Sequence, residues 1–167
     1  MKFLPTENIT YKTKLKENEI VDRLSNIIEP EKTFRFEIFG NSSTKLYEGK
    51  INNLTFDIKR IITYRNSFIP RISGVINHDF DGTTIKVKMR LHIFVIIFIC
   101  IWSSGVGLGC LAVLTSLLAD GTFHPATIIP FGMLIFMYVL TMGAFKYESN
   151  ISKKGLQELF DAEIVEV

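Results

Sequence analysis

Two long runs without a single charged side chain constrain this sequence more than any other feature. The first run extends from Ile93 to Ala119 and the second from Pro125 to Phe145. At about 1.5 Å per residue, a helix over either run would cross a hydrocarbon core about 30 Å thick. A buried helix of a soluble protein is the alternative for one such run. Two runs separated only by residues 120–124 favour a transmembrane hairpin.

The charges that flank these runs predict their orientation. Residues 120–124 contain no Lys or Arg, whereas cations stand on both outer flanks: Lys86, Lys88, Arg90, Lys146, Lys153 and Lys154. Lys and Arg accumulate on the cytoplasmic side of membrane spans. We therefore expect a multi-pass membrane protein with both termini in the cytoplasm and a short outer loop. The first residues, MKFLPTENITYKTKL, contain no apolar stretch of signal-peptide length, so entry through the first span is expected.

Composition excludes several classes of protein. The chain has 167 residues, with 19 Lys and Arg against 17 Asp and Glu, which gives a net charge of +2. This balance is unlike that of a strongly basic nucleic-acid-binding protein, so no nucleic-acid partner is expected. Both cysteines, Cys100 and Cys110, fall in the first apolar run. On one helix they stand about 15 Å apart, too far for a disulfide.

Residues 1–92 alternate between apolar and polar side chains in several short segments. The pattern predicts a strand over 10–15, a helix over 16–28, and strands over 34–39, 46–51, 54–64, 67–77 and 83–91. The last segment alternates most clearly, because its apolar residues share one face and its cations the other: Ile85, Val87, Met89 and Leu91 against Lys86, Lys88 and Arg90. We expect an antiparallel meander with one apolar face.

A second amphipathic helix is predicted over residues 152–165, with an apolar stripe formed by Leu156, Leu159, Phe160 and Ile164. Such a helix is unstable alone in water, so it should cover the apolar face of the sheet. The predicted fold class is α+β: an antiparallel sheet with an N-terminal helix and a C-terminal closing helix, interrupted by a two-helix transmembrane hairpin. The expected parts are 1–92 in the cytoplasm, spans over 93–119 and 125–145, the outer loop 120–124, and the closing segment 146–167 packed on 1–92.

The order of strand, helix, antiparallel strands and closing helix resembles the helix-grip architecture of START-like domains, with a PH-like barrel as the competing pattern. Four phrases look like those of small, uncharacterised bacterial two-span membrane proteins: FRFEIFGNSSTKLYEG, RIITYRNSFIPRISG, IKVKMRLH and KYESN. This resemblance implies a bacterial inner (plasma) membrane location. It implies no activity and assigns no functional residue.

Glycines cluster in the phrase SSGVGLGC of the first apolar run. Gly105, Gly107 and Gly109 lack the preceding strand and polar surroundings of a dinucleotide-binding loop. Gly105 and Gly109 instead match the small-xxx-small spacing that lets membrane helices approach closely. Gly132 and Gly143 are the matching candidates on the second run. We expect helix packing at these positions, within the chain or against another copy.

Catalytic and metal-binding patterns are weak in this sequence. His78, His92 and His124 show no metal-ligand spacing, and no Ser or Cys stands in a nucleophile motif. Neither apolar run contains an ionisable residue in its interior, which argues against a pump or carrier. The sequence therefore predicts no cofactor, no metal and no enzymatic activity.

The cations of the last strand before the first span have two interpretations. Lys86, Lys88 and Arg90 could form an ordinary solvated face that also sets the topology. They could also contact anionic lipid headgroups, at about 1 kcal/mol for each cation near the leaflet. We keep lipid-headgroup contact as a prediction for these three residues.

Two functional hypotheses follow. The first is a membrane-tethered cytoplasmic binding module for a lipid or other apolar ligand at the inner leaflet. It requires a cavity of roughly 300 Å³ or more between sheet and closing helix, lined by Phe34, Phe36, Phe56, Ile58, Ile85 and Val87. The second is a non-catalytic structural or regulatory subunit with a filled core, whose partners are the bilayer and another copy or membrane protein. An enzyme acting on lipid is a third, weaker alternative.

Overall fold

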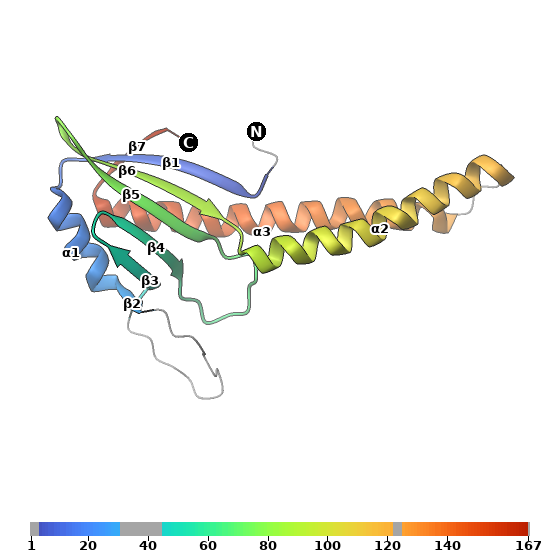
Figure 1. Ribbon diagram of the computed structural model, residues 1–167, viewed down its shortest axis with the longest axis horizontal. Helices are drawn as coiled ribbons and strands as arrows, with labels where there is room; N and C mark the ends of the chain where they lie inside the picture. The colour runs from blue at the N-terminus through green and yellow to red at the C-terminus, as the bar shows by residue number, and fades with distance from the viewer. Residues whose placement is uncertain (1–3, 31–44, 122–124, 167) are drawn as a thin grey trace.

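The structure is a computed structural model that describes residues 4–30, 45–121 and 125–166. It is an α+β arrangement in which a sheet with helices on one face forms one end, and two long helices project from it (Figure 1). The predicted strand over 34–39, with Phe34 and Phe36, lies outside the described residues. So does most of the predicted outer loop.

Seven strands in the described part of the chain form one sheet, in the order β2-β3-β4-β5-β6-β1-β7. The strands are β1 Thr6–Thr13, β2 Ile28–Pro30, β3 Tyr47–Asn52, β4 Thr55–Arg60, β5 Arg71–Asp79, β6 Gly82–Arg90 and β7 Glu163–Glu166. All neighbours pair antiparallel except β2 and β3, which are parallel. The antiparallel strands from β3 to β6 confirm the predicted meander.

The first helix, α1, spans Glu17–Ile27 and follows β1 directly. The Glu19 side chain accepts a hydrogen bond from the backbone N–H of Lys16 at 3.0 Å, which satisfies one of the free donors at the start of the helix. Ile20 and Leu24 recur at helical spacing and are fully buried against the sheet. The predicted amphipathic helix is therefore confirmed.

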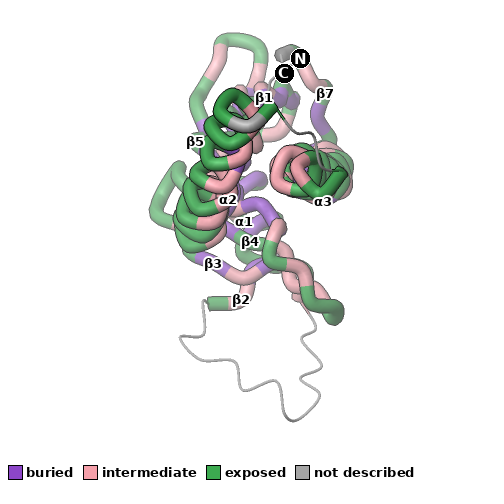
Figure 2. The backbone as a smooth tube through the Cα atoms, turned by 90° about the vertical axis from the view of Figure 1, so that its right-hand side faces the viewer, coloured by how far each residue is buried: buried purple, intermediate pink, exposed green. Residues whose placement is uncertain are grey.

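The two apolar runs form α2, Ile93–Asp120, and, after a short 3-10 turn η1 at Pro125–Ile128, α3, Ile129–Phe160. Both are long and apolar enough to cross a membrane by length and composition. Only 6% and 11% of their most apolar windows are buried, which is unlike the core helix of a soluble protein. Figure 2 shows α2 almost wholly exposed or half-buried along its length.

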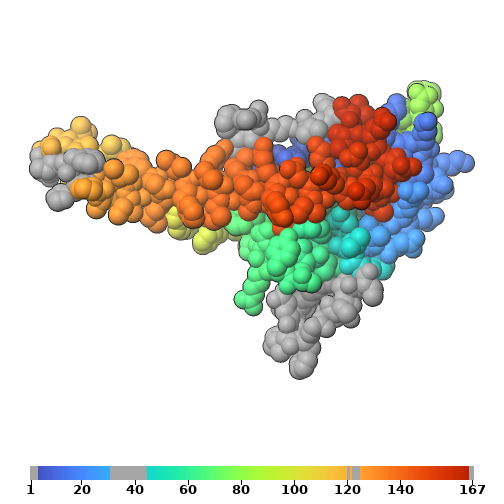
Figure 3. Space-filling view, turned by 180° about the vertical axis from the view of Figure 1, so that it is seen from behind, coloured from blue at the N-terminus to red at the C-terminus, as the bar shows by residue number. Residues whose placement is uncertain are grey.

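Helix α3 continues far beyond Phe145, the predicted end of the second span. It is unbroken to Phe160, and it runs from the projecting end across the sheet (Figure 3). Lys146 and the polar residues after it lower the hydropathy, but Lys and Glu are good helix formers. The helix therefore continues without a break where the hydropathy falls after Phe145. The same rigid element links the apolar projection to the sheet.

The predicted closing helix over 152–165 is wrong at its C-terminal end. Asp161 adopts a left-handed conformation (φ 45°) and ends α3 by donating its backbone N–H to the carbonyls of Gln157 and Glu158. The next residues form β7, which pairs antiparallel with β1. Ile164 and Val165 are β-branched and favour a strand. Since β1 offers an open edge there, strand pairing prevails over the helical periodicity.

The core lies between the sheet and the helices α1 and α3. Its fully buried side chains come from all three: Ile9, Tyr11, Ile58, Ile72, Ile76, Ile85, Met89, Ile20, Leu24, Phe145, Leu156 and Phe160. The Phe160 ring packs edge-on against Tyr11, with ring centroids 5.8 Å apart. A Cβ at Gly74 would stand 2.1 Å from the Phe56 ring, so this ring occupies the space that a side chain at Gly74 would need. The core is filled by side chains from residues 1–92, from 146–167 and from Phe145 at the end of the predicted second span.

Candidate functional site

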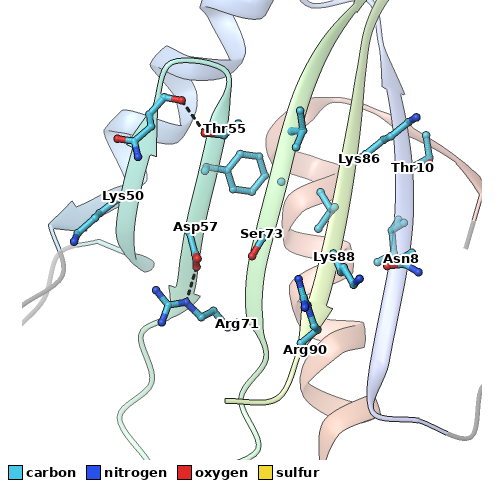
Figure 4. A pocket seen from close by; sticks show the side chains of 16 residues that line it. Asn8, Thr10, Lys50, Thr55, Asp57, Arg71, Ser73, Lys86, Lys88 and Arg90 are labelled. Atoms are coloured by element: carbon cyan, nitrogen blue, oxygen red, sulfur yellow. Dashed lines mark hydrogen bonds and ion pairs between the residues drawn. The ribbon is translucent and has the colours of Figure 1, made fainter. Parts of the chain in front are cut away.

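The face of the sheet opposite the helices carries a row of cations on β6. Ile85, Val87 and Met89 alternate with these cations and point into the core. Because side chains alternate along a strand, the cations point to the other face. Figure 4 shows the three of them side by side: Lys86, Lys88 and Arg90.

Neighbouring strands complete a hollow on this face, with a volume of about 810 Å³. Small residues are among those that line it, including Ser73, Gly74 and Thr10. Five cations and one carboxylate surround it: Lys50, Arg71, Lys86, Lys88, Arg90 and Asp57 (Figure 4). We call this hollow the basic trough. The strand order brings Lys50 and Arg71 to the cations of β6.

The charges of the basic trough are unevenly paired. The guanidinium of Arg71 donates from Nε to Asp57 Oδ1 at 2.7 Å. Arg90 stands directly opposite Arg71 in the sheet register, a like-charge placement that is unfavourable. In the described part of the chain, no carboxylate lies within ion-pair distance of Lys86, Lys88 or Arg90. The trough therefore has surplus positive charge.

Aromatic side chains contribute little to the basic trough. Phe56 is the one aromatic residue among its described lining residues, and it is 3% exposed with its ring against Gly74. Proteins that bind single-stranded nucleic acid stack bases on exposed aromatic rings. The described lining residues provide no such platform.

A second polar cluster lies where α3 meets the loop between β4 and β5. Glu148 on α3 is 1% exposed, and its carboxylate accepts hydrogen bonds from Arg60, from Tyr64 Oη at 2.5 Å and from Asn66 Nδ2 at 2.7 Å. Arg60 also donates to Tyr64 Oη at 2.9 Å. The hydrogen bond to Glu148 and then partial burial raise the pKa of Tyr64. We call these four residues the Glu148 cluster.

The Glu148 cluster fixes the β4–β5 loop to α3. A buried carboxylate without partners is costly, and three donors offset that cost. Asn66 also holds the loop itself, because its Oδ1 accepts from the backbone N–H of Phe68 at 2.9 Å. Two segments far apart in the sequence, RIITYRNSFIPRISG and KYESN, meet in this cluster. The sequence pattern predicts one strand over 54–64 and another over 67–77, which leaves Asn66 between two elements, and it does not single out Glu148.

The contact between α3 and the sheet contains further buried polar atoms. Tyr11 Oη donates to the backbone carbonyl of Lys153 at 3.1 Å, and burial raises the pKa of Tyr11. Among the described residues, the hydroxyls of Ser149 and Ser152 and the Nε of Arg60 have no hydrogen-bond partner. The interface is therefore partly polar, unlike the apolar core beside it.

A third feature is a pocket of about 260 Å³ between α2 and α3, beside the start of the chain. Its lining is mainly aliphatic, with Leu91, Ile96, Ile99, Leu134 and Met137 among others. Thr141 also lines this pocket. It is 6% exposed, and its hydroxyl has no partner in the described part of the chain. We call this space the interhelical pocket.

The glycines predicted to pack helices lie in open surroundings. A Cβ at each of them would meet nothing within 4 Å among the described atoms: Gly105, Gly109, Gly132 and Gly143. Close packing of α2 on α3 within one chain therefore does not use them. Packing against another copy or a partner stays a prediction.

The two histidines of the described residues have ordinary structural surroundings. The His78 ring lies 3.7 Å from Glu17 Oε1 and is largely exposed. His92 precedes α2, where its ring stacks on Phe94 and its Nδ1 accepts from the Phe94 N–H at 3.4 Å. Among the described residues, no group of three or more His, Cys, Asp or Glu side chains could hold a metal ion.

No protein-family model, no curated protein and no solved structure matches this chain.

Proposed function

We propose that the protein is a membrane-anchored docking module. In this proposal α2 and the first part of α3, residues 93–119 and 125–145, form a transmembrane hairpin in a bacterial inner membrane. Both termini and the sheet lie on the cytoplasmic side. The basic trough binds an extended acidic segment of a partner protein. The single observation that carries the proposal is the row formed by Lys86, Lys88 and Arg90, for which no carboxylate of the described residues lies within ion-pair distance.

The filled core favours docking over storage of an apolar ligand beneath the sheet. Large side chains with no exposed area, including Tyr11, Phe145 and Phe160, occupy the space where that ligand was expected. A pocket large enough for a ligand lies on the opposite, polar face. This arrangement supports the regulatory or structural subunit among the two hypotheses from the sequence.

The spacing of the cations favours an extended acidic chain. Lys86, Lys88 and Arg90 follow one another at every second residue, which places them about 6.8 Å apart along β6. Side chains on one face of an extended peptide repeat at the same interval. An acidic segment with carboxylates at alternate positions can therefore lie along the trough and face each cation in turn.

The membrane surface is a poorer occupant of the whole trough. Arg90 is three residues before the start of α2, whereas Lys86 is about 13 Å farther along the strand. Strands and α3 run roughly along the long axis of the molecule (Figure 1), so the trough leads away from the projecting helices. Electrostatic attraction falls off over about 8 Å at physiological ionic strength. Lipid-headgroup contact therefore stays a prediction mainly for Arg90.

A binding measurement with matched charge reversals tests this proposal. The full-length protein is placed in phosphatidylcholine nanodiscs and titrated with a fluorescent peptide of alternating Glu and Ser. We expect the K86E/K88E/R90E variant to lose at least tenfold in affinity, and the wild-type affinity to fall as salt rises. The control K14E/K16E/K154E carries the same charge change on exposed positions outside the trough, and it should bind within about twofold of wild type.

Two outcomes of this measurement would overturn docking of an acidic chain. One is an equal loss of affinity in the trough variant and the control variant, which would indicate a non-specific charge effect. The other is a clear preference for a single-stranded oligonucleotide or for phosphatidylglycerol nanodiscs without peptide. The second outcome would assign the cations to a different class of ligand.

A further inference from the structure

The interhelical pocket joins two features that a lipid would satisfy together. It has mainly aliphatic walls from the first turns of α2 and from the middle of α3. Thr141 is one of its lining residues, and the hydroxyl of Thr141 is buried and has no partner among the described residues. A buried hydroxyl without a hydrogen bond is unfavourable, and an empty apolar space leaves its walls without contacts.

We infer that this pocket holds one acyl chain of a membrane phospholipid, whose ester carbonyl accepts a hydrogen bond from Thr141 Oγ1. The inference rests on the membrane placement proposed above and is independent of docking at the basic trough. The aliphatic walls would surround the acyl chain, and Thr141 would fix its ester end. The lipid would thus fill the gap between α2 and α3.

The depth of Thr141 fits the ester region of a phospholipid. Thr141 lies four residues before Phe145, which places it about 6 Å inside the cytoplasmic end of the proposed span. The polar interface of a bilayer begins at the edge of its hydrocarbon core of about 30 Å. A carbonyl at that edge is within reach of a hydroxyl just below it. Leu134, Met137 and Tyr138 of α3 also line the pocket and lie deeper, where the acyl chain continues, while Met142 lies beside Thr141 toward the cytoplasmic end.

The positions of the glycines on α2 and α3 favour a lipid over a second copy of the chain as the occupant of the interhelical pocket. The glycines that would let another helix approach closely, Gly105, Gly109 and Gly132, are not among the residues that line the pocket. A helix from another copy would therefore pack elsewhere on α2 and α3. A flexible acyl chain can fill an irregular space of about 260 Å³ without such a surface.

Native mass spectrometry of the full-length protein in detergent, titrated with phosphatidylglycerol, tests the inference. We expect one phospholipid to be retained at activation that removes all others. The T141V variant keeps the side-chain shape and should lower the apparent affinity about two- to tenfold, the value of one hydrogen bond. The C100W variant fills the pocket and should lower it at least tenfold.

Two matched controls separate the pocket from the general surface of the helices. I101W places the same bulk at the next position of α2, where the side chain is 70% exposed. T115V removes a hydroxyl that donates to Ala112 and lies outside the pocket. Both should retain the phospholipid as wild type does. Equal retention in all four variants would overturn the inference, as would tighter retention of oleate than of phosphatidylglycerol.

Sodium carbonate extraction separates failure of the inference from failure of the membrane placement. A protein that carbonate releases from the membrane fraction is not integral, and both proposals then fail. A protein that stays integral and retains no phospholipid overturns only the pocket assignment. If the K86E/K88E/R90E variant retains the phospholipid as wild type does, lipid binding is separate from the trough.

Discussion

At the residue scale, the most consequential feature is a single carboxylate. Glu148 is nearly inaccessible, and it stands on α3 just beyond the apolar part of that helix. Its three donors come from the end of β4 and the following loop, so one side chain holds three segments of backbone together. A buried carboxylate is stable only with such partners. The orientation of the sheet relative to α3 therefore depends on this cluster.

Replacement of Glu148 by Gln tests that dependence. The E148Q variant removes the negative charge and leaves the Arg60 guanidinium without its counter-ion, so we expect a loss of about 3 kcal/mol in the free energy of unfolding. Y64F removes one donor to a charged acceptor and should cost about 1–2 kcal/mol. Urea unfolding of the full-length protein in detergent measures both.

The matched control for this prediction is E158Q, an exposed Glu on the same helix. It should change the free energy of unfolding by less than about 0.5 kcal/mol. If E148Q behaved like E158Q, the cluster would not hold the loop to α3.

At the element scale, α3 is one continuous helix where the sequence predicted two, a membrane span and a closing helix. Its first part has the hydropathy of a membrane span, and its last three turns complete the core through Leu156 and Phe160. β7 then adds a strand at the open edge of β1. The end of α3 covers the core, whereas β7 covers the edge of β1. Deleting one or the other should therefore have different consequences for stability.

Two deletions separate these contributions. Removal of residues 150–167 takes away Leu156 and Phe160, so we expect the sheet to lose its protease resistance because the core is opened. Removal of residues 163–167 takes away only β7 and its partner contacts, and should leave a protease-resistant domain with lower thermal stability. Limited proteolysis in detergent compares the two. Equal resistance of the longer deletion and the full chain would contradict a shared core.

The sequence predicts those parts of the fold that depend on local patterns. The alternation in β6 is confirmed, since it places Val87 in the core and Lys88 on the opposite face. The C-terminal helix was extended too far because the spacing of Leu156, Phe160 and Ile164 fits a helix as well as it fits a helix followed by a strand. Local periodicity does not show that β1 has an open edge.

The sites depend on contacts between residues far apart in the chain, and these were largely missed. Tyr64 and Glu148 are separated by 84 positions, and the sequence around neither residue predicts a contact with the other. Lys50 and Arg71 join the cations of β6 only through the order of the strands. The sequence left open whether the core is hollow or filled, because the alternating strands do not reveal how completely the aromatic side chains fill it.

At the scale of the whole molecule, the sheet and the projecting helices present separate surfaces. The basic trough lies on the face that the helices leave uncovered, and the interhelical pocket lies between α2 and α3. The Glu148 cluster joins the end of β4 and the loop after it to α3. In our account the membrane holds the two helices, and the sheet presents the trough to an acidic partner.

Photo-crosslinking from one position at the trough tests this account most directly. A photoreactive amino acid replaces Thr55, which lines the trough, or Asp22, which is exposed on α1 on the other face of the sheet. Our account predicts that the peptide of alternating Glu and Ser crosslinks to position 55 in inside-out vesicles, and not to position 22 or to either position in sealed spheroplasts. Equal crosslinking at both positions, or crosslinking in spheroplasts, would contradict it.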